Sequence, residues 1–376
     1  MSKPVSAGIG EPYFDKFTTN VIKGIALIMM FLHHFFTFPE WWLDGIEYPF
    51  METIAPYFRA PFELCVPIFC FLTGYFYAFR QSKTFRYSLK KISDLLLSYW
   101  CVFFVFALIA VCGGYRQYTV GNFVKECFAL SRPTMVFCWY VAFYLISMLA
   151  LPCLTKIMSK NIHVNLLIAY IGAPLAFRLL AHFIPSDIIR ETLWNTERWF
   201  PCILTGYLFA EYRFFPKIQN INDALLKRKW MNIVIWSLML LLVPMGRLWA
   251  PDVSIGFAGV FSFSVSIDAI YAPAFIYLTV NLSKSIGWKH PPKILFFIGK
   301  YSMLMWFVSC IFFNPCKSLF QPILYLPQNP ILVMLWGLLL CFAASFVFDL
   351  LTGVLLKLKN KLLFPSTSKT DTQPKP

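Results

Sequence analysis

Long apolar stretches that alternate with short polar ones dominate the pattern along the chain. About ten stretches are long enough to cross roughly 30 Å of hydrocarbon as helices, and the one near 199–213 is the shortest. They lie near 21–38, 62–79, 94–112, 135–152, 164–182, 199–213, 231–249, 264–281, 294–313 and 331–356. The polar connections are too short to form an extramembrane domain. The pattern therefore predicts an all-α fold, a polytopic transmembrane helix bundle of about ten spans.

The same pattern divides the chain into three parts. Residues 1–20 form a polar N-terminal segment, 21–356 the transmembrane domain, and 357–376 a polar, Pro-containing tail that we expect to be disordered. Lys and Arg collect in cytoplasmic connections. Most of the 33 basic residues fall in alternate connections if the N-terminus is inside. Both termini are therefore predicted to be cytoplasmic.

Composition excludes an ordinary soluble domain and several kinds of partner. Hydrophobic residues make up 59% of the chain and charged residues only 14%. Membrane topology explains most of the net charge of +15, and no nucleic-acid-binding pattern accompanies it. We therefore expect membrane lipids, and no nucleic acid, as partners. The 11 cysteines lack the short spacing of a zinc or redox site, so no metal is expected.

The same four residues occur in two places, Leu72-Thr73-Gly74-Tyr75 and Leu204-Thr205-Gly206-Tyr207. Small residues let two helices approach closely. Packing is therefore the expected role of both copies, without any contact to a substrate.

The first predicted span contains the ionisable residues Lys23, His33 and His34. Ionisable groups at membrane depth are costly, which makes them functional candidates. Lys23 and His34 are eleven residues apart, so a helix places them on one face, roughly 16 Å apart along its axis, and His33 points elsewhere. Imidazole can take and return a proton near neutral pH. The structural alternative is a polar helix end, with Lys23 reaching the lipid headgroups and the histidines bonded to a neighbouring helix.

The first span and three later stretches resemble the acyltransferase-3 family of integral-membrane acyltransferases. Lys23-Gly24-Ile25-Ala26, continued to His34, is similar to the family's basic residue, ten intervening positions and histidine. Lys23 replaces the usual Arg, which keeps the charge but loses the bidentate fork. A second family histidine is missing, because its place falls near Ser309. Three further stretches resemble the family in the same order: Val66–Tyr75, Trp139–Tyr140 and Gly299–Met303.

The resemblance implies a reaction and a location. The protein would move an acetyl, or another short acyl, group from acetyl-CoA to a hydroxyl of a surface glycan or lipid-linked saccharide, in the bacterial cytoplasmic (inner) membrane. His34 would be the general base, although an acetyl-histidine intermediate stays open, and Lys23 would contact the CoA end or the thioester oxygen. The CoA phosphates need cations, for which the candidates are Arg80, Arg86, Lys90 and Lys91. The enrichment of Lys and Arg in cytoplasmic connections would by itself also explain each of these four basic residues.

Two further questions stay open at this stage. Carboxylates such as Glu63, Asp94 and Asp268 could orient His34 or bind the acceptor, and Asp268 lies several residues inside the predicted span 264–281. The alternative function is a glycan or lipid transporter or flippase, in which Lys23 and His34 form a proton relay.

Overall fold

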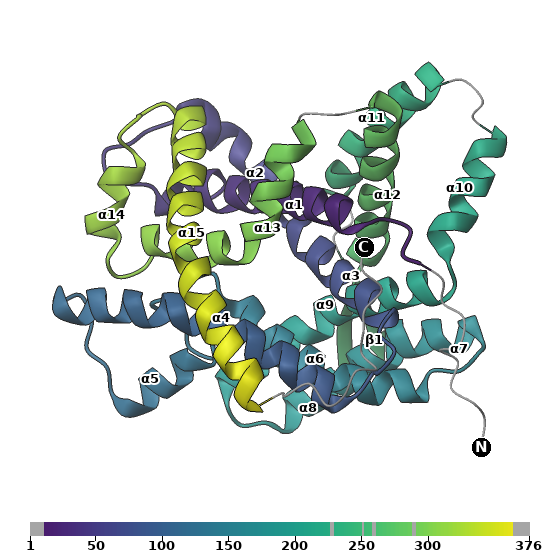
Figure 1. Ribbon diagram of the computed structural model, residues 1–376, viewed down its shortest axis with the longest axis horizontal. Coiled ribbons are helices and arrows are strands. Elements are labelled where there is room, and N and C mark those ends of the chain that lie inside the picture. The colour runs from purple at the N-terminus through teal and green to yellow at the C-terminus, as the bar shows by residue number, and fades with distance from the viewer. Residues whose placement is uncertain (1–10, 226–228, 250–251, 258–260, 288–290, 364–376) are drawn as a thin grey trace.

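The computed structural model describes residues 11–225, 229–249, 252–257, 261–287 and 291–363, which form a bundle of helices (Figure 1). The α-helices are α1 (Lys16–Phe36), α2 (Pro49–Glu63), α3 (Cys65–Ala78), α4 (Phe85–Cys112), α5 (Val120–Cys127), α6 (Trp139–Ile157), α7 (Ile162–Leu167), α8 (Ala173–Phe183), α9 (Asp187–Glu211), α10 (Phe214–Leu225), α11 (Lys229–Gly246), α12 (Asp268–Ile286), α13 (Pro291–Ser309), α14 (Lys317–Leu324) and α15 (Pro330–Leu363). Single-turn segments are η1 (Pro39–Trp41), η2 (Ile168–Gly172) and η3 (Cys310–Phe312). The predicted helical class is therefore confirmed.

Within the described residues, 7 helical stretches are long and apolar enough to cross a membrane. They are Lys16–Phe36, Pro49–Ala78, Phe85–Cys112, Trp139–Ile157, Ile162–Phe183, Lys293–Phe312 and Pro330–Leu363. The predicted stretches near 199–213, 231–249 and 264–281 lie largely on α9, α11 and α12, which are outside this set. The chain is thus an integral membrane protein, while the number of ten spans and the side of the termini stay predictions.

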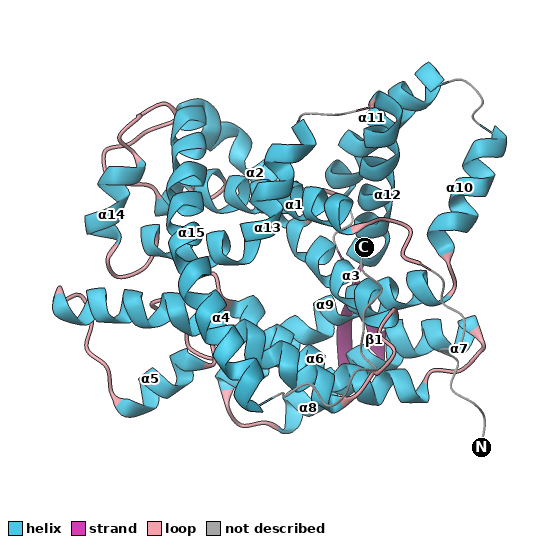
Figure 2. Cartoon of the chain, viewed as in Figure 1, coloured by secondary structure: helices cyan, strands magenta, loops and turns pink. Residues whose placement is uncertain are grey.

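A β-hairpin interrupts the helices between α11 and α12. Strands β1 (Asp252–Phe257) and β2 (Phe261–Ser266) pair antiparallel and β2 packs beside α9 (Figure 2). The alternation Phe-Ser-Phe-Ser from residue 261 has the two-residue period of a strand. The predicted span 264–281 therefore begins too early, since its first residues belong to β2 and α12 begins only at Asp268.

Two segment boundaries in the structure also differ from the predicted ones. Helix α1 begins at Lys16, before residue 21, because the Asp15 side chain accepts a hydrogen bond of 2.7 Å from the Thr18 amide and caps the helix. Helix α15 packs on α13 and α4 (Figure 1) and continues through Leu363. Residues 357–363 are therefore helical and not part of a disordered tail, and residues 364–376 lie outside the described residues.

The two Thr-Gly copies bring α3 and α9 into close contact. A Cβ at Gly74 of α3 would collide with the carbonyl oxygen of Ile203 on α9. In return, a Cβ at Gly206 of α9 would collide with the carbonyl oxygen of Phe71 on α3. The prediction that both copies serve close helix packing is confirmed.

Helix α1 is held against α13 by the same kind of contact. A Cβ at Gly24 would collide with the Leu295 carbonyl oxygen, and one at Gly299 with the Asn20 carbonyl oxygen. This close packing fixes the helix that carries Lys23 and His34.

Candidate functional site

A partly open cavity of about 680 Å³ lies among α1, α3, α4, α6 and α13. Lys23 and His34 both line it, at levels of α1 that are roughly 16 Å apart by helix geometry. Much of the wall between these levels is apolar and includes Met30, Leu72 and Met148. The cavity therefore connects the two residues that the spacing in the first span singled out.

Aromatic stacking positions His34 at one end of the cavity. The imidazole lies parallel to the Phe137 ring, with centroids 3.8 Å apart and an interplanar angle of 5°. Its Nδ1 is buried and has no hydrogen-bond partner among the described residues. The nitrogen that can reach a molecule in the cavity is therefore Nε2. We find no carboxylate bonded to this ring within the described part of the chain, so the stack with Phe137 is what orients it.

His33 lines the same cavity, which corrects the prediction that it points elsewhere. Its Nδ1 lies 3.0 Å from the carbonyl oxygen of Arg59 on α2. A carbonyl oxygen only accepts, so Nδ1 must carry the proton of this hydrogen bond. The hydrogen bond therefore selects the tautomer in which Nε2 is the hydrogen-bond acceptor.

Helix α2 supplies these contacts, although most of it lies between the predicted spans 21–38 and 62–79. The Arg59 side chain donates to the carbonyl oxygen of Thr37, just beyond α1, with Nη2 at 2.7 Å and Nε at 3.2 Å. The Thr37 hydroxyl in turn donates to the His33 carbonyl oxygen at 2.5 Å. The end of α1 and the end of α2 are therefore fixed to each other beside the cavity.

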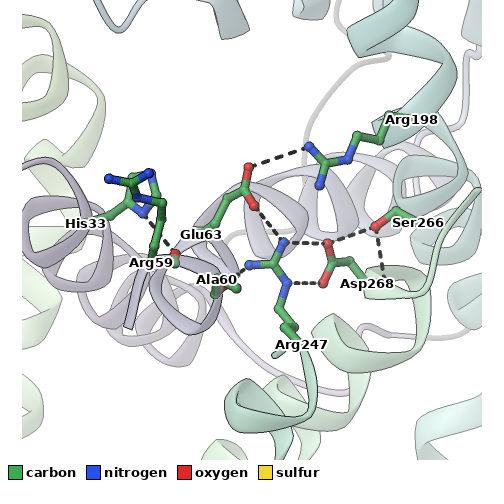
Figure 3. A network of polar contacts seen from close by, with 8 residues as sticks. All are labelled: His33, Arg59, Ala60, Glu63, Arg198, Arg247, Ser266 and Asp268. Carbon is green, nitrogen blue, oxygen red and sulfur yellow. Dashed lines mark hydrogen bonds and ion pairs between the residues drawn. The ribbon is translucent and has the colours of Figure 1, made fainter. Parts of the chain in front are cut away.

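A buried ion network lies on the other side of α2 (Figure 3). The Arg247 and Asp268 side chains are both 0% exposed. Arg247 Nε donates to Asp268 Oδ1 at 2.5 Å, while Nη2 donates to Asp268 Oδ2 at 3.0 Å and to Glu63 Oε2 at 2.9 Å. Arg198 forms a second ion pair with Glu63 at 3.7 Å, and the Ser266 hydroxyl donates to Asp268 at 2.8 Å. The network joins α2, α9, β2 and α12 around one buried guanidinium.

The break between α2 and α3 explains why Arg247 also bonds the backbone. The Leu64 amide bonds the Pro61 carbonyl oxygen at 3.3 Å, instead of the Ala60 carbonyl oxygen that a continuing helix would use. The Ala60 carbonyl oxygen accepts from Arg247 Nη1 instead. Of the four charged network members, Glu63 lines the cavity.

Arg247 was not among the candidates expected from the sequence, although it lies near the end of the predicted span 231–249. The sequence did contain one indication of such a residue, because a carboxylate that is buried needs a cation as its partner. Asp268 was the acidic residue most expected at depth, and Arg247 is the basic residue that ends the preceding apolar stretch. Asp268 is buried as expected, although it is the first residue of α12 and not an internal one.

Cations line the opposite end of the cavity. Lys23, Arg80 and Lys91 line it there, together with Asp94. Asp94 pairs with Lys359 of α15 and lies 4.0 Å from Lys91. Lys23 has no hydrogen-bond or ion-pair partner in the part of the chain that the structure describes. A cation without a counterion at this depth is suited to bind an anionic ligand.

The structure separates the basic residues of the loop after α3 and the start of α4. Arg80 and Lys91 line the cavity, whereas Arg86 is exposed and neither Arg86 nor Lys90 contributes to the lining. The neighbouring Lys83 donates to the Tyr207 hydroxyl at 2.9 Å and pairs with Glu211 at 3.6 Å. Burial lowers the pKa of Lys83, and Glu211 opposes this shift. Lys83 therefore has a structural partner.

Other candidate groups lie away from the cavity. His163 and His182 are exposed and do not line the cavity. Among the described residues, no three His, Cys, Asp or Glu side chains are grouped as a metal ion requires. The ionisable side chains that line the cavity include those of the two histidines, three cations and the carboxylates Glu63 and Asp94.

The fold and the cavity define an integral membrane protein with a site inside its helix bundle. Residues 18–350 of the 376-residue chain match a family model described as an acyltransferase domain. The chain belongs to this acyltransferase-3 family and is a membrane acyltransferase, which confirms the family that the sequence resembled. Comparison with curated proteins and with solved structures gave no match.

Proposed function

We propose that the protein transfers an acetyl, or another short acyl, group from acyl-CoA to a hydroxyl of a surface glycan or lipid-linked saccharide in the bacterial cytoplasmic membrane. The observation that supports this proposal most strongly is the shared cavity. It is lined by Lys23, Arg80 and Lys91 at one end and by His34 at the other. A donor with an anionic head and a reactive thioester tail fits this arrangement.

The donor would lie along the cavity. Its phosphates would contact the unpaired Lys23 and the nearby Arg80 and Lys91, because charge-assisted hydrogen bonds to phosphate are strong. The pantetheine arm would then follow the apolar wall over the roughly 16 Å that separate the levels of Lys23 and His34. At that separation, Lys23 binds the CoA end and is too far from His34 to reach the thioester oxygen.

His34 would carry the proton. As the acceptor oxygen attacks the acyl carbonyl carbon, His34 Nε2 takes the hydroxyl proton. The carbon–sulfur bond then breaks, and the CoA thiolate receives the proton from His34. The stack with Phe137 supports this role, because it holds the ring with one nitrogen toward the cavity. The products are an ester and free CoA.

The first test is an acyl-transfer assay with inside-out membrane vesicles, whose outer surface is the cytoplasmic one. Vesicles that contain the protein are incubated with acetyl-labelled CoA and a glycan and glycolipid extract of the host. We expect free CoA and ester-linked label in the saccharide fraction, and neither product in matched vesicles without the protein. Movement of an unmodified saccharide across the membrane without CoA release would contradict the proposal and favour a transporter.

The donor end gives a second prediction. The double variant Arg80→Gln/Lys91→Gln is expected to raise the KM for acetyl-CoA about tenfold, because each loses one charged contact to phosphate. Initial rates over a range of acetyl-CoA concentrations measure this effect. The matched control is Arg86→Gln/Lys90→Gln, which removes the same charge from residues outside the cavity lining. An equal rise in KM for both pairs would show that surface charge, and not contact within the cavity, attracts the donor.

A further inference from the structure

The charges that line the cavity are distributed unequally between its two ends. Lys23, Arg80 and Lys91 line the end away from His34, together with Asp94. Among the described lining residues, Glu63 is the charged one at the His34 end, where Arg247 and Arg198 pair with it. Cations therefore outnumber carboxylates in the lining of the first end, which favours an anionic group there, whereas the second end presents a carboxylate to its ligand.

Two side chains at the His34 end, those of His33 and Glu63, offer hydrogen-bond acceptors to the cavity. His33 Nδ1 carries a proton, which it donates to the Arg59 carbonyl oxygen. In neutral His33 the other nitrogen, Nε2, therefore has no proton and can only accept a hydrogen bond. The Glu63 oxygens bind Arg247 at 2.9 Å and Arg198 at 3.7 Å. A carboxylate has about four lone-pair sites, so Glu63 can accept further hydrogen bonds from a molecule in the cavity.

Aromatic side chains complete this end of the cavity. Phe137 stacks on His34, and Trp139 and Tyr140 of α6 also line the cavity. Flat apolar surfaces with a few fixed polar groups are typical of small-molecule sites. Such a site suits a ligand that has an apolar ring face and several hydroxyl donors along its edge.

We propose that His33 and Glu63 form the acceptor subsite and select an uncharged, hydroxyl-rich saccharide over an anionic one. This inference rests on the proposed function. One hydroxyl of the acceptor donates to His33 Nε2 and a neighbouring one to Glu63, which leaves a third free to approach His34. A carboxylate or phosphate on the same ring would face the lone pairs of both residues.

The test compares two sugars that differ in charge. Purified protein in lipid nanodiscs is given acetyl-CoA with methyl glucoside or methyl glucuronide at equal concentration, and ester formation and CoA release are measured together. The ratio of sugar acetylation to acetyl-CoA hydrolysis is expected to be about tenfold higher for the glucoside. Equal ratios for the two sugars, or hydrolysis without any sugar ester, would overturn the acceptor subsite. The absence of CoA release would instead contradict the proposed function itself.

Two variants of His33 separate acceptor binding from structural support. His33→Asn retains a donor at the Nδ1 position for the Arg59 carbonyl oxygen, but loses the acceptor at Nε2. His33→Gln can place an amide oxygen near the Nε2 position, but loses the bond to Arg59. We expect the ratio of glucoside acetylation to hydrolysis to fall about tenfold in His33→Asn and less in His33→Gln. His182→Asn, at an exposed site, is the matched control. An unchanged ratio in His33→Asn would overturn the assignment, because structural damage alone lowers both reactions together.

Discussion

His34→Ala is expected to lower acyl transfer about a hundredfold or more, which is the loss typical of a removed general base. The ring nitrogen that faces the cavity takes the hydroxyl proton, and alanine has no group that can do so. The stack with Phe137 fixes the ring, to which no carboxylate of the described residues is bonded. The measurement is the initial rate of CoA release and of ester formation at saturating acetyl-CoA, normalised to the amount of inserted protein.

Two controls distinguish lost chemistry from lost structure. His34→Phe retains an aromatic ring that can stack on Phe137 but removes both nitrogens, so it should be as inactive as His34→Ala. His163→Ala removes an exposed histidine that does not line the cavity and should retain full activity. Substantial transfer by His34→Phe would contradict the role of His34 as base and would direct attention to His33.

Helix geometry explains why the Lys23 and His34 pair could be predicted from the sequence. A spacing of eleven residues places both on one face of any regular helix, whatever the rest of the fold. The width of the cavity around that face depends on packing against other helices. His33 was therefore assigned away from the site, whereas in the structure both histidines line the cavity.

Long-range pairing explains what the sequence could not show. The partners of Arg247 are Glu63, Asp268 and the Ala60 carbonyl oxygen, and two of these lie more than 180 positions away. Hydropathy and charge counts treat each segment separately, so they do not indicate which distant residues pair with Arg247. The hairpin was missed for a different reason, because its alternating residues adjoin an apolar stretch and were included in the predicted span.

Arg247→Met is expected to destabilise the protein by about 3 to 5 kcal/mol, the range for breaking a buried ion pair by removing one partner. Arg247 is 0% exposed, and its loss leaves the fully buried Asp268 without its cation and Glu63 with Arg198 alone. Methionine has a similar length and is apolar, so the packing volume is largely retained. The measurement is the free energy of unfolding of the purified protein in detergent by denaturant titration.

The exposed ion pair between Arg132 and Glu191 supplies the matched control. The two side chains are 2.5 Å apart, as close as Arg247 Nε and Asp268, but the Glu191 side chain is 55% exposed. Arg132→Met should therefore cost about 1 kcal/mol or less, since water screens exposed pairs. Adding Asp268→Asn to Arg247→Met should recover part of the lost stability, because it removes the uncompensated buried charge. Equal losses for the Arg132 and Arg247 variants would show that burial of the Arg247 network does not determine its contribution to stability.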